Sequence, residues 1–372
     1  MTNPPIPSTL DEVTADWLTA ALRASGVLRE ARVSAVDQVR VGAGVGILGE
    51  LARATLTYDR EEPGAPRTLI AKIPTSDLGG RGIAHMLGYY EREIRYYRDL
   101  SADNVAASPR CYYSDMDPAN VRFVLLLEDL ASLPIGDQVA GCSAEEARAV
   151  VRELAKLHAR WWERPELKAI DWIPPSNDPM MKLAQGAYLM AITPFLEKFG
   201  GRMTPAQREI ALALGPRMNA MQDSFAAAPE TLLHADVRLD NIFFGSSQLG
   251  SAITLIDWQI LVKGRGPYDV AYFLSQSLDP AERKSVEEDL LRDYHRRLLD
   301  AGVTDYAWER CWDDYRLSVL FCLCYPVISI GSIDPANARG VALTTAMADR
   351  SLAAITDLGC AELLERFAPA AV

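Results

Sequence analysis

The sequence predicts an α+β fold with two lobes, in which a small antiparallel sheet precedes a larger, mostly helical part. Over residues 33–73 apolar side chains recur at every second position, whereas after residue 129 they recur at helical spacing. The length of 372 residues exceeds what one hydrophobic core usually supports, so we expect two lobes with a ligand cleft between them. The change of pattern predicts an N-terminal lobe over residues 1–130 and a C-terminal lobe over residues 131–372.

The first lobe is expected to open with a helix, followed by strands and one further helix. Apolar side chains at helical spacing predict the opening helix over residues 9–25, and Thr9 and Glu12 are placed as its capping box. Helical spacing returns over residues 86–100, which predicts the second helix. Period-two patterning predicts strands at residues 39–41, 52–58, 68–73, 111–114 and 122–127.

The second lobe is expected to be helical except for short strands that end in acids. Residues 231–236 and 253–257 are apolar runs ending in carboxylates, and residues 242–244 lie between them. Acids at the ends of short buried strands are candidate site residues. The most apolar stretch, residues 317–333, holds a proline and a glycine near its middle, so it predicts a buried helix with its exit loop rather than a membrane span.

Composition and charge exclude several classes of function. The chain has 38 Lys and Arg against 50 Asp and Glu, a net charge of −12, which argues against nucleic-acid and anionic-membrane partners. Its six cysteines form no C-x-x-C pair and do not suggest a disulfide framework or a zinc site. Residues 1–10 lack the basic and apolar regions of a signal peptide. We therefore expect a cytoplasmic protein with 49% hydrophobic residues and a large core.

The strongest functional signal is the segment His234 to Asn241, which has the form H-x-D-x-x-x-x-N and is followed by Asp257 after an apolar strand. Phosphoryl transfer needs a carboxylate beside the attacking hydroxyl and two further oxygen ligands for Mg²⁺ on the β- and γ-phosphates. Asp236, Asn241 and Asp257 supply that set. Each alone is better explained by a turn, but the three in order, together with features of the first lobe, favour a phosphotransferase site.

Two features of the first lobe fit a nucleotide site. The glycine-spaced turn over residues 41–49, with Gly44 and Gly46, has a backbone that could close over phosphates, although hairpins also use glycine for positive φ. Lys72 interrupts an apolar strand, from which its ammonium could reach the α- and β-phosphates. The alternative for Lys72 is an edge-strand lysine that extends to water.

The helix over residues 89–98 offers a carboxylate partner for Lys72. Glu93 is favoured, because three tyrosines and an isoleucine put the neighbouring face of this helix against the sheet. Glu91 is the competing candidate, and either side chain could instead lie on a solvated face.

With these motifs the chain resembles the kinase-like phosphotransferases, within the superfamily of aminoglycoside phosphotransferases, choline kinases and ecdysteroid kinase-like proteins. The resemblance covers residues 41–274 and implies a protein-kinase-like bilobal fold. Several details look closest to the ecdysteroid kinase-like branch. These are the strand end at 125–130, the helix at 91–97, the Asp257-Trp-Gln form of the metal motif and the segment 266–274.

The resemblance implies a role for each matching residue. Asp236 would be the catalytic base, Asn241 and Asp257 would bind Mg²⁺, and Lys72 with Glu93 would anchor the phosphates of ATP.

The resemblance also implies roles for the surrounding backbone. The segment from Glu128 to Leu130 would be the hinge that holds adenine, His234 would brace the catalytic loop, and Asp269 would tie a loop down rather than touch substrate. Ala235 stands where protein kinases carry Arg. Only about ten residues separate Gln259 from Asp269, which leaves no room for an activation segment, so no protein substrate is expected and the acceptor is a small molecule.

These observations lead to one main hypothesis with alternatives. The main one is Mg²⁺-dependent transfer of the γ-phosphate of ATP to a hydroxyl of a small organic acceptor, with a steroid-like or other apolar alcohol favoured. An aminoglycoside, a hydroxyacyl thioester and a choline-like alcohol stay open as acceptors. Two other classes are a non-catalytic nucleotide-binding scaffold and a metal-dependent hydrolase that acts on phosphoesters without ATP.

Overall fold

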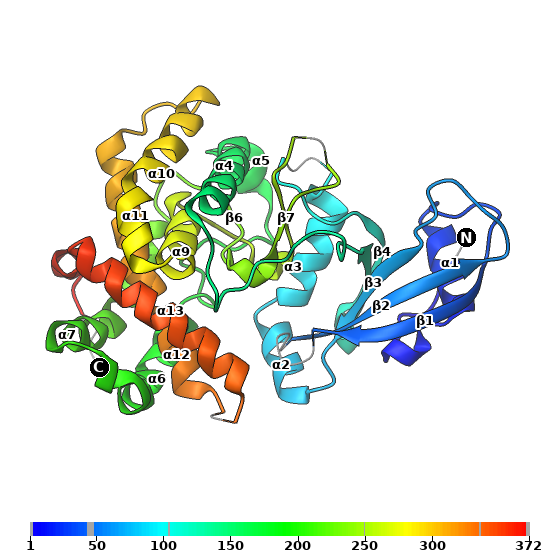
Figure 1. Ribbon diagram of the computed structural model, residues 1–372, viewed down its shortest axis with the longest axis horizontal. Coiled ribbons are helices and arrows are strands. Elements are labelled where there is room, and N and C mark those ends of the chain that lie inside the picture. Colours follow the sequence, from blue (N-terminus) through cyan, green and yellow to red (C-terminus); the bar gives the residue numbers. More distant parts are fainter. Residues whose placement is uncertain (1–2, 43–47, 103–104, 249, 335, 370–372) are drawn as a thin grey trace. The chain divides into compact units, whose positions relative to one another are not determined.

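The computed structural model describes residues 3–42, 48–102, 105–248, 250–334 and 336–369 (Figure 1). By its internal contacts the chain divides into two compact units. The first, called the sheet unit, comprises Met1–Asp103 and Ser108–Leu133. The second, called the helical unit, comprises Asn104–Ala107 and Pro134–Val372.

The sheet unit contains one five-stranded sheet, whose order is β1-β2-β3-β5-β4. Every neighbouring pair of strands is antiparallel. This sheet, followed by a helical unit, confirms the predicted α+β fold class. The strands are β1 (Val33–Val41), β2 (Gly49–Tyr58), β3 (Thr68–Pro74), β4 (Cys111–Asp117) and β5 (Arg122–Glu128).

The opening helix α1 (Ala15–Ala24) covers the sheet with its apolar face. Its side chains Leu18 and Leu22 are fully buried in one core with residues of the strands. Trp17 meets the ring of Tyr113 on β4 edge to face, with 5.9 Å between ring centroids. The apolar spacing seen in the sequence therefore creates the contact between helix and sheet.

The predicted start of this helix at Thr9 is wrong. Residues Leu10–Glu12 form a separate 3₁₀ turn in which Thr9 makes no side-chain cap. The Glu12 carboxylate instead accepts a hydrogen bond from the Ser8 N–H at 2.7 Å. The helix begins after Thr14, whose hydroxyl accepts from the Trp17 N–H, so Thr14 satisfies the free N–H groups of the first turn.

The predicted helix over residues 86–100 has the wrong bounds. The structure has α2 (Leu78–Met86), then α3 (Tyr89–Arg95), which continues as a π-helical turn over Tyr96–Leu100. Gly88 separates α2 from α3 with φ +69°, a left-handed conformation that glycine adopts at little cost. Three glycines inside α2 weaken its helical pattern in the sequence, which explains why α2 was not predicted.

The helical unit is built around α9 (Pro267–Ser277), in which every residue is buried. A helix that is covered on all sides can hold site residues rigidly. The surrounding helices are α4 (Ala144–Trp161), α5 (Pro165–Ala169), α6 (Leu183–Phe199), α7 (Pro205–Leu214), α8 (Met218–Phe225), α10 (Pro280–Asp300), α11 (Trp308–Cys322), α12 (Cys324–Ser332) and α13 (Ala338–Asp357).

Two short antiparallel ribbons interrupt the helices. β6 (Thr231–Leu233) pairs with β9 (Val262–Gly264), and β7 (Ile242–Phe244) pairs with β8 (Ile253–Leu255). Strand β9 was not predicted, because it is only three residues long and has a lysine at its centre. The lysine is tolerated because its Nζ donates to the Ile170 carbonyl at 2.6 Å.

The apolar stretch near the C-terminus forms helices α11 and α12. Within the described residues, one helical stretch, Trp308–Gly331, is long and apolar enough by length and composition to cross a membrane. About three quarters of its most apolar window is buried inside the protein (72%), as in the core helix predicted for this segment.

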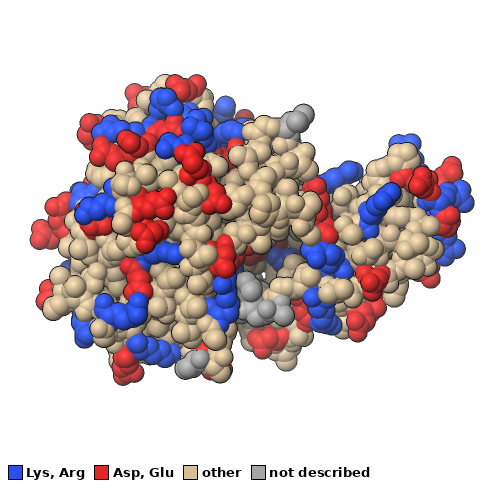
Figure 2. Space-filling model, in the orientation of Figure 1, with Lys and Arg blue, Asp and Glu red and all other residues tan. Residues whose placement is uncertain are grey.

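Charged side chains of both signs are interspersed over the visible face of the helical unit. Figure 2 shows red and blue side chains close to one another on that face. Ion pairs of exposed side chains in the helical unit include Arg202–Asp349, Arg292–Glu288 and Arg366–Asp313. Exposed pairs of this kind contribute little to stability.

The substitution Leu18→Ala tests the contact between α1 and the sheet. It should lower the free energy of unfolding by about 2–5 kcal/mol, because it leaves a cavity beside the strands. Leu78→Ala is the matched control, since this leucine is 80% exposed and its removal should change stability by less than about 0.5 kcal/mol. Urea unfolding measures both, and equal effects would contradict the packing described here.

Candidate active site

The loop after β6 contains a non-glycine residue in the left-handed region of backbone conformation. Ala235 adopts φ +63°, a conformation that costs a non-glycine residue about 1–2 kcal/mol. The buried carboxylate of Asp269, on α9, accepts hydrogen bonds from the His234 N–H at 2.8 Å and the Ala235 N–H at 2.9 Å. These two bonds hold the loop in its strained conformation and so place the next residue, Asp236.

Asp269 is itself oriented by a buried histidine. His158 lies on α4 and its Nε2 is 3.2 Å from the Asp269 Oδ2. Its Nδ1 is 2.8 Å from the Tyr294 hydroxyl. In this arrangement the tyrosine donates to Nδ1 and Nε2–H donates to the carboxylate, so His158 acts as a packed helix residue that supports the loop.

His234 connects the Asp236 loop to the loop that carries Asp257. Its Nδ1 accepts from the Asp236 N–H at 3.3 Å, and its Nε2 donates to the Ile256 carbonyl at 3.0 Å. The Ile256 N–H in turn donates to the Asn241 carbonyl at 3.0 Å. The two acid-bearing loops are therefore joined through one side chain and one backbone bond.

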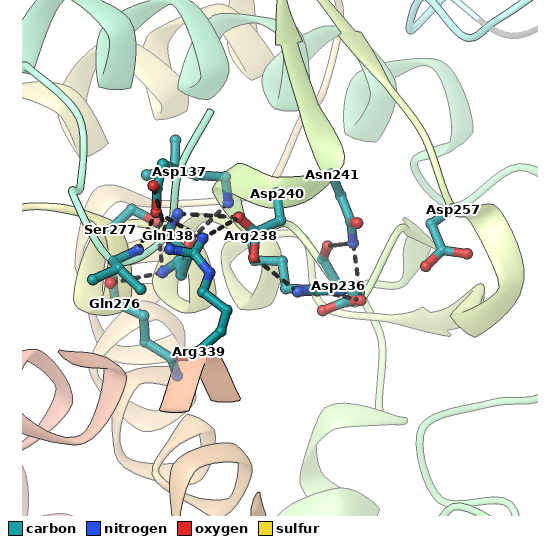
Figure 3. Close-up of polar contacts among 12 residues, drawn as sticks. Asp137, Gln138, Asp236, Arg238, Asp240, Asn241, Asp257, Gln276, Ser277 and Arg339 are labelled. Carbon is teal, nitrogen blue, oxygen red and sulfur yellow. Dashed lines mark hydrogen bonds and ion pairs between the residues drawn. The ribbon is translucent and has the colours of Figure 1, made fainter. Parts of the chain in front are cut away.

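Three donors surround the Asp236 carboxylate. The Asn241 Nδ2 lies 2.9 Å and the Arg238 Nε 3.4 Å from Oδ2 (Figure 3). The Tyr272 hydroxyl, on α9, donates to Oδ1 at 3.0 Å. These donors hold the carboxylate in one orientation. Its side chain is 14% exposed, so it still reaches the surface.

Arg238 lies between two carboxylates, as Figure 3 shows. Besides contacting Asp236, its Nη1 donates to the Asp240 Oδ2 at 3.1 Å. Burial alone would lower the pKa of this guanidinium, but the charges of Asp236, Asp240 and Asp257 raise it above its usual range. Arg238 is therefore a permanent cation that neutralises part of the acidic charge at the site.

Asp240 is fixed from its other side by residues distant in sequence. Its Oδ1 accepts from the Gln138 N–H at 3.3 Å and from Arg339 at 3.4 Å (Figure 3). The Gln138 Oε1 also accepts from the Leu239 N–H at 2.7 Å. This network links the catalytic-loop segment to the chain just after the sheet unit and to the first turn of α13.

Asn241 and Asp257 offer the oxygen ligands that a Mg²⁺ ion would need. The Asn241 Nδ2 donates to Asp236, and no hydrogen bond among the described residues engages its Oδ1. Asp257, at φ +66°, accepts from the Gln259 Nε2 at 3.2 Å. The described residues contain no group of three or more His, Cys, Asp or Glu arranged for a metal. Two oxygen ligands completed by substrate phosphates fit Mg²⁺ best.

In the sheet unit, Lys72 on β3 forms a buried ion pair with Glu93 on α3. The Lys72 Nζ lies 2.8 Å from Oε1 and 2.7 Å from Oε2 of Glu93, and both side chains are almost fully buried. Glu91, the competing candidate, pairs with Arg95 on the exposed side of the helix at 2.9 Å. The structure therefore pairs Lys72 with Glu93 and not with Glu91.

The remaining sequence candidates lie elsewhere in the sheet unit. Glu128 exchanges hydrogen bonds with Arg110: its N–H donates to the Arg110 carbonyl, and its carboxylate accepts from the Arg110 N–H. Leu130 is buried, and its carbonyl accepts from the N–H of the third residue on. Gly44 and Gly46 lie outside the described residues.

Sequence reasoning missed Tyr272, Gln138 and Arg339. Tyr272 follows Asp269 by three residues on α9, so helical periodicity alone would have placed it on the same face as a known candidate. Gln138 and Arg339 meet the loop from about 100 residues away, and no local pattern marks them.

Comparison with known proteins gives matches at the level of family and fold. The profile of the ecdysteroid kinase-like family matches residues 44–303, well over half of the chain. No curated protein matches the sequence significantly.

Among solved structures, a putative aminoglycoside phosphotransferase from Ralstonia eutropha JMP134 aligns with a TM-score of 0.54 at 15% identity, over 92% of this chain and 97% of that one. The GDP complex of aminoglycoside 2'-phosphotransferase-IIIa has a TM-score of 0.50 at 12% identity, over 86% and 93% of the two chains. Choline kinase from Cryptosporidium parvum Iowa II gives 0.49 at 11% identity, over 89% of both. The family match and the first structural match confirm the predicted kinase-like fold.

The substitution Asp269→Ala tests the role of the buried carboxylate. It should lower the free energy of unfolding by about 3–5 kcal/mol, because two loop N–H groups and His158 lose their buried acceptor. Asp289→Ala, on the exposed face of α10, is the control and should change stability by less than about 0.5 kcal/mol. A loss below about 1 kcal/mol in urea unfolding of Asp269→Ala would mean that the loop does not depend on this residue.

Proposed function

Because this chain belongs to the ecdysteroid kinase-like family and is a small-molecule phosphotransferase, we propose that it transfers the γ-phosphate of ATP to a hydroxyl group of an uncharged, apolar organic acceptor. The observation that carries the proposal is the geometry around Asp236. One carboxylate reaches the surface while three donors fix its orientation, and two further oxygen ligands lie on adjacent loops. That set matches the needs of phosphoryl transfer.

Asp236 is assigned the proton-accepting role. The acceptor hydroxyl binds its carboxylate, which orients the oxygen toward the γ-phosphorus and takes the proton as the new O–P bond forms. The bond from the γ-phosphorus to the bridging oxygen breaks at the same stage, and ADP leaves with that electron pair. Arg238 keeps the local charge low enough for Asp236 to stay close to an incoming polyphosphate.

Asn241 and Asp257 are assigned to Mg²⁺. A bound Mg²⁺ would neutralise charge on the β- and γ-phosphate oxygens. The Asn241 amide nitrogen donates to Asp236, so that its amide oxygen is left to bind the metal. The bond between Ile256 and Asn241 keeps the two ligand-bearing loops in register.

Lys72 and Glu93 are assigned to the phosphates of the nucleotide. A buried ammonium paired with a carboxylate is held in a fixed position, which suits it to binding the α- and β-phosphates. The backbone of Glu128 to Leu130 is proposed to bind adenine, and the turn with Gly44 and Gly46 to cover the phosphates.

Nucleotide binding is supported by the GDP complex of aminoglycoside 2'-phosphotransferase-IIIa, which shares the fold, and ATP is proposed as the donor here.

A cytoplasmic location is supported by the six cysteines, all of which are free thiols. An aminoglycoside and a hydroxyacyl thioester are the alternative acceptors.

The substitution Asp236→Asn tests the assigned proton acceptor. It should lower kcat by about 10²–10⁴-fold while the KM for ATP stays within about threefold, because the amide cannot take a proton. Transfer of labelled γ-phosphate to a panel of alcohols measures the effect, with Asp289→Asn as the exposed control. Nearly full activity in Asp236→Asn would reject this assignment.

Two neighbouring glutamates provide a matched test of the phosphate anchor. Glu93→Gln should lower kcat/KM for ATP by about 10–100-fold, because Lys72 loses its buried partner and its fixed position. Glu91→Gln changes only an exposed pair and should have less than about a twofold effect. Steady-state kinetics with varied ATP distinguish the two, and equal effects would remove Glu93 from the proposed site.

A further inference from the structure

Two tyrosines flank the Asp236 carboxylate on one side. Tyr272 of α9 donates to its Oδ1 at 3.0 Å. The ring of Tyr325, on α12, meets the Tyr272 ring at 64°, with 4.5 Å between ring centroids. The Tyr325 hydroxyl lies 2.6 Å from the Tyr268 hydroxyl and 3.4 Å from the Ala235 carbonyl. Together they form an aromatic wall next to the catalytic-loop backbone.

The hydrogen bonds of Asp236 leave one place for an acceptor hydroxyl. An ionised carboxylate has two oxygens and about four lone-pair positions. Asn241 and Arg238 occupy both positions on Oδ2, and Tyr272 occupies one on Oδ1. The remaining position is therefore on Oδ1, next to the Tyr272 hydroxyl.

Tyr272 keeps that arrangement at any physiological pH. Burial, together with the neighbouring Asp236 charge, raises the pKa of the Tyr272 hydroxyl well above its usual range. The group therefore stays protonated and can only donate to Oδ1. It fixes which position of Oδ1 is occupied and which one faces the acceptor.

From this geometry we infer that the acceptor hydroxyl binds Oδ1 of Asp236 beside Tyr272, and that the ring of Tyr325 selects an uncharged, apolar alcohol. The inference rests on the proposed function and adds the side of approach and the two residues that define it. Tyr272 is a positioning residue that acts through Asp236. Tyr325, which is partly exposed, is the specificity-determining residue.

The surroundings of Tyr325 support an uncharged acceptor. Helix α12 contains no charged residue. It packs closely on α6, where a Cβ on Gly331 would lie 2.6 Å from the Cβ of Ala191. Helix α6 is also apolar and has its only charged residues, Glu197 and Lys198, at its C-terminal end.

The carboxylates of the site are also committed to other partners. Those of Asp236 and Asp240 contact Arg238, and that of Asp257 is assigned to Mg²⁺. A polycationic aminoglycoside would need free carboxylates along its length, whereas an apolar alcohol needs only one hydrogen-bond acceptor and an apolar wall.

The acceptor oxygen bonds to the γ-phosphorus while its proton passes to Oδ1 of Asp236, and the bond to the bridging oxygen breaks with its electron pair going to ADP. Tyr272 keeps its own proton throughout. Removing its hydroxyl should therefore slow the step without changing ATP binding.

The experiment measures γ-phosphate transfer from labelled ATP to testosterone, 4-phenylbutanol, choline and kanamycin. Tyr272→Phe should lower kcat by about 10–100-fold with the KM for ATP unchanged, because one hydrogen bond to a charged group is lost. Tyr325→Ala should raise the KM for the apolar alcohol about tenfold, and Tyr325→Phe should restore it because the ring is kept.

Tyr315→Phe is the matched control. Its hydroxyl also donates to a buried carboxylate, that of Glu287 at 2.6 Å, but on α10 and α11 away from Asp236. The Tyr315→Phe variant should lose stability as Tyr272→Phe does, but its kcat and its KM values should stay those of the wild type. Thermal unfolding of all variants separates folding defects from kinetic ones.

Four outcomes would overturn the inference. Preference for choline or kanamycin over both apolar alcohols would reject the acceptor class and leave the phosphotransferase function standing. Full kcat in Tyr272→Phe would reject the assigned approach at Oδ1. An unchanged acceptor KM in Tyr325→Ala would reject the selecting role of its ring. Failure of the wild type to label any acceptor while it binds ATP would reject the proposed function itself.

Discussion

The Asp269 carboxylate accepts three hydrogen bonds in the interior of the helical unit, and the geometry of the catalytic loop follows from them. Burying an isolated carboxylate costs several kcal/mol, so it persists only where donors surround it. Here two donors are consecutive backbone N–H groups, which can converge on one carboxylate only if the chain turns sharply. The left-handed Ala235 provides that turn, and the bonds to Asp269 offset its strain.

Charge balance is the second constraint on the site. The charges of Asp236, Asp240 and Asp257 all act on Arg238, and without this cation the three like charges would repel one another. Arg238 bridges two of the three, and Arg339 adds a second contact to Asp240. A site that must admit a polyphosphate gains from this arrangement, because two of the three carboxylates are paired with a cation before the nucleotide arrives.

The sequence predicted those parts of the structure that depend on local patterns. The strands of the sheet and the order of the acid-bearing loops follow from alternation and from spacing within about 25 residues. Gly88 and the glycines of α2 misled the helix prediction, because propensity there is weak and tertiary contacts decide. The partners of Asp240 could not be predicted, since Gln138 and Arg339 meet it only through the packing of distant elements.

The pairing of Lys72 with Glu93 shows where pattern and packing give the same answer. Helix α3 carries two glutamates, Glu91 and Glu93. Only Glu93 lies on the face that packs toward β3. The charge on Lys72 makes that choice consequential, because a buried ammonium without its carboxylate would be far less stable. A face assignment from apolar neighbours therefore also predicted an electrostatic contact.

Helix α9 combines these constraints in one element. Because every residue of α9 is buried, the surrounding packing fixes where the helix lies. Asp269 and Tyr272 lie one turn apart on it. Asp269 sets the backbone of the catalytic loop, whereas Tyr272 sets the orientation of the carboxylate that this backbone presents. Because both act from the same rigid helix, the position of Asp236 and the direction of its remaining lone pair are fixed together. A shift of α9 would change both at once, so the packing around this helix is itself part of the active-site geometry.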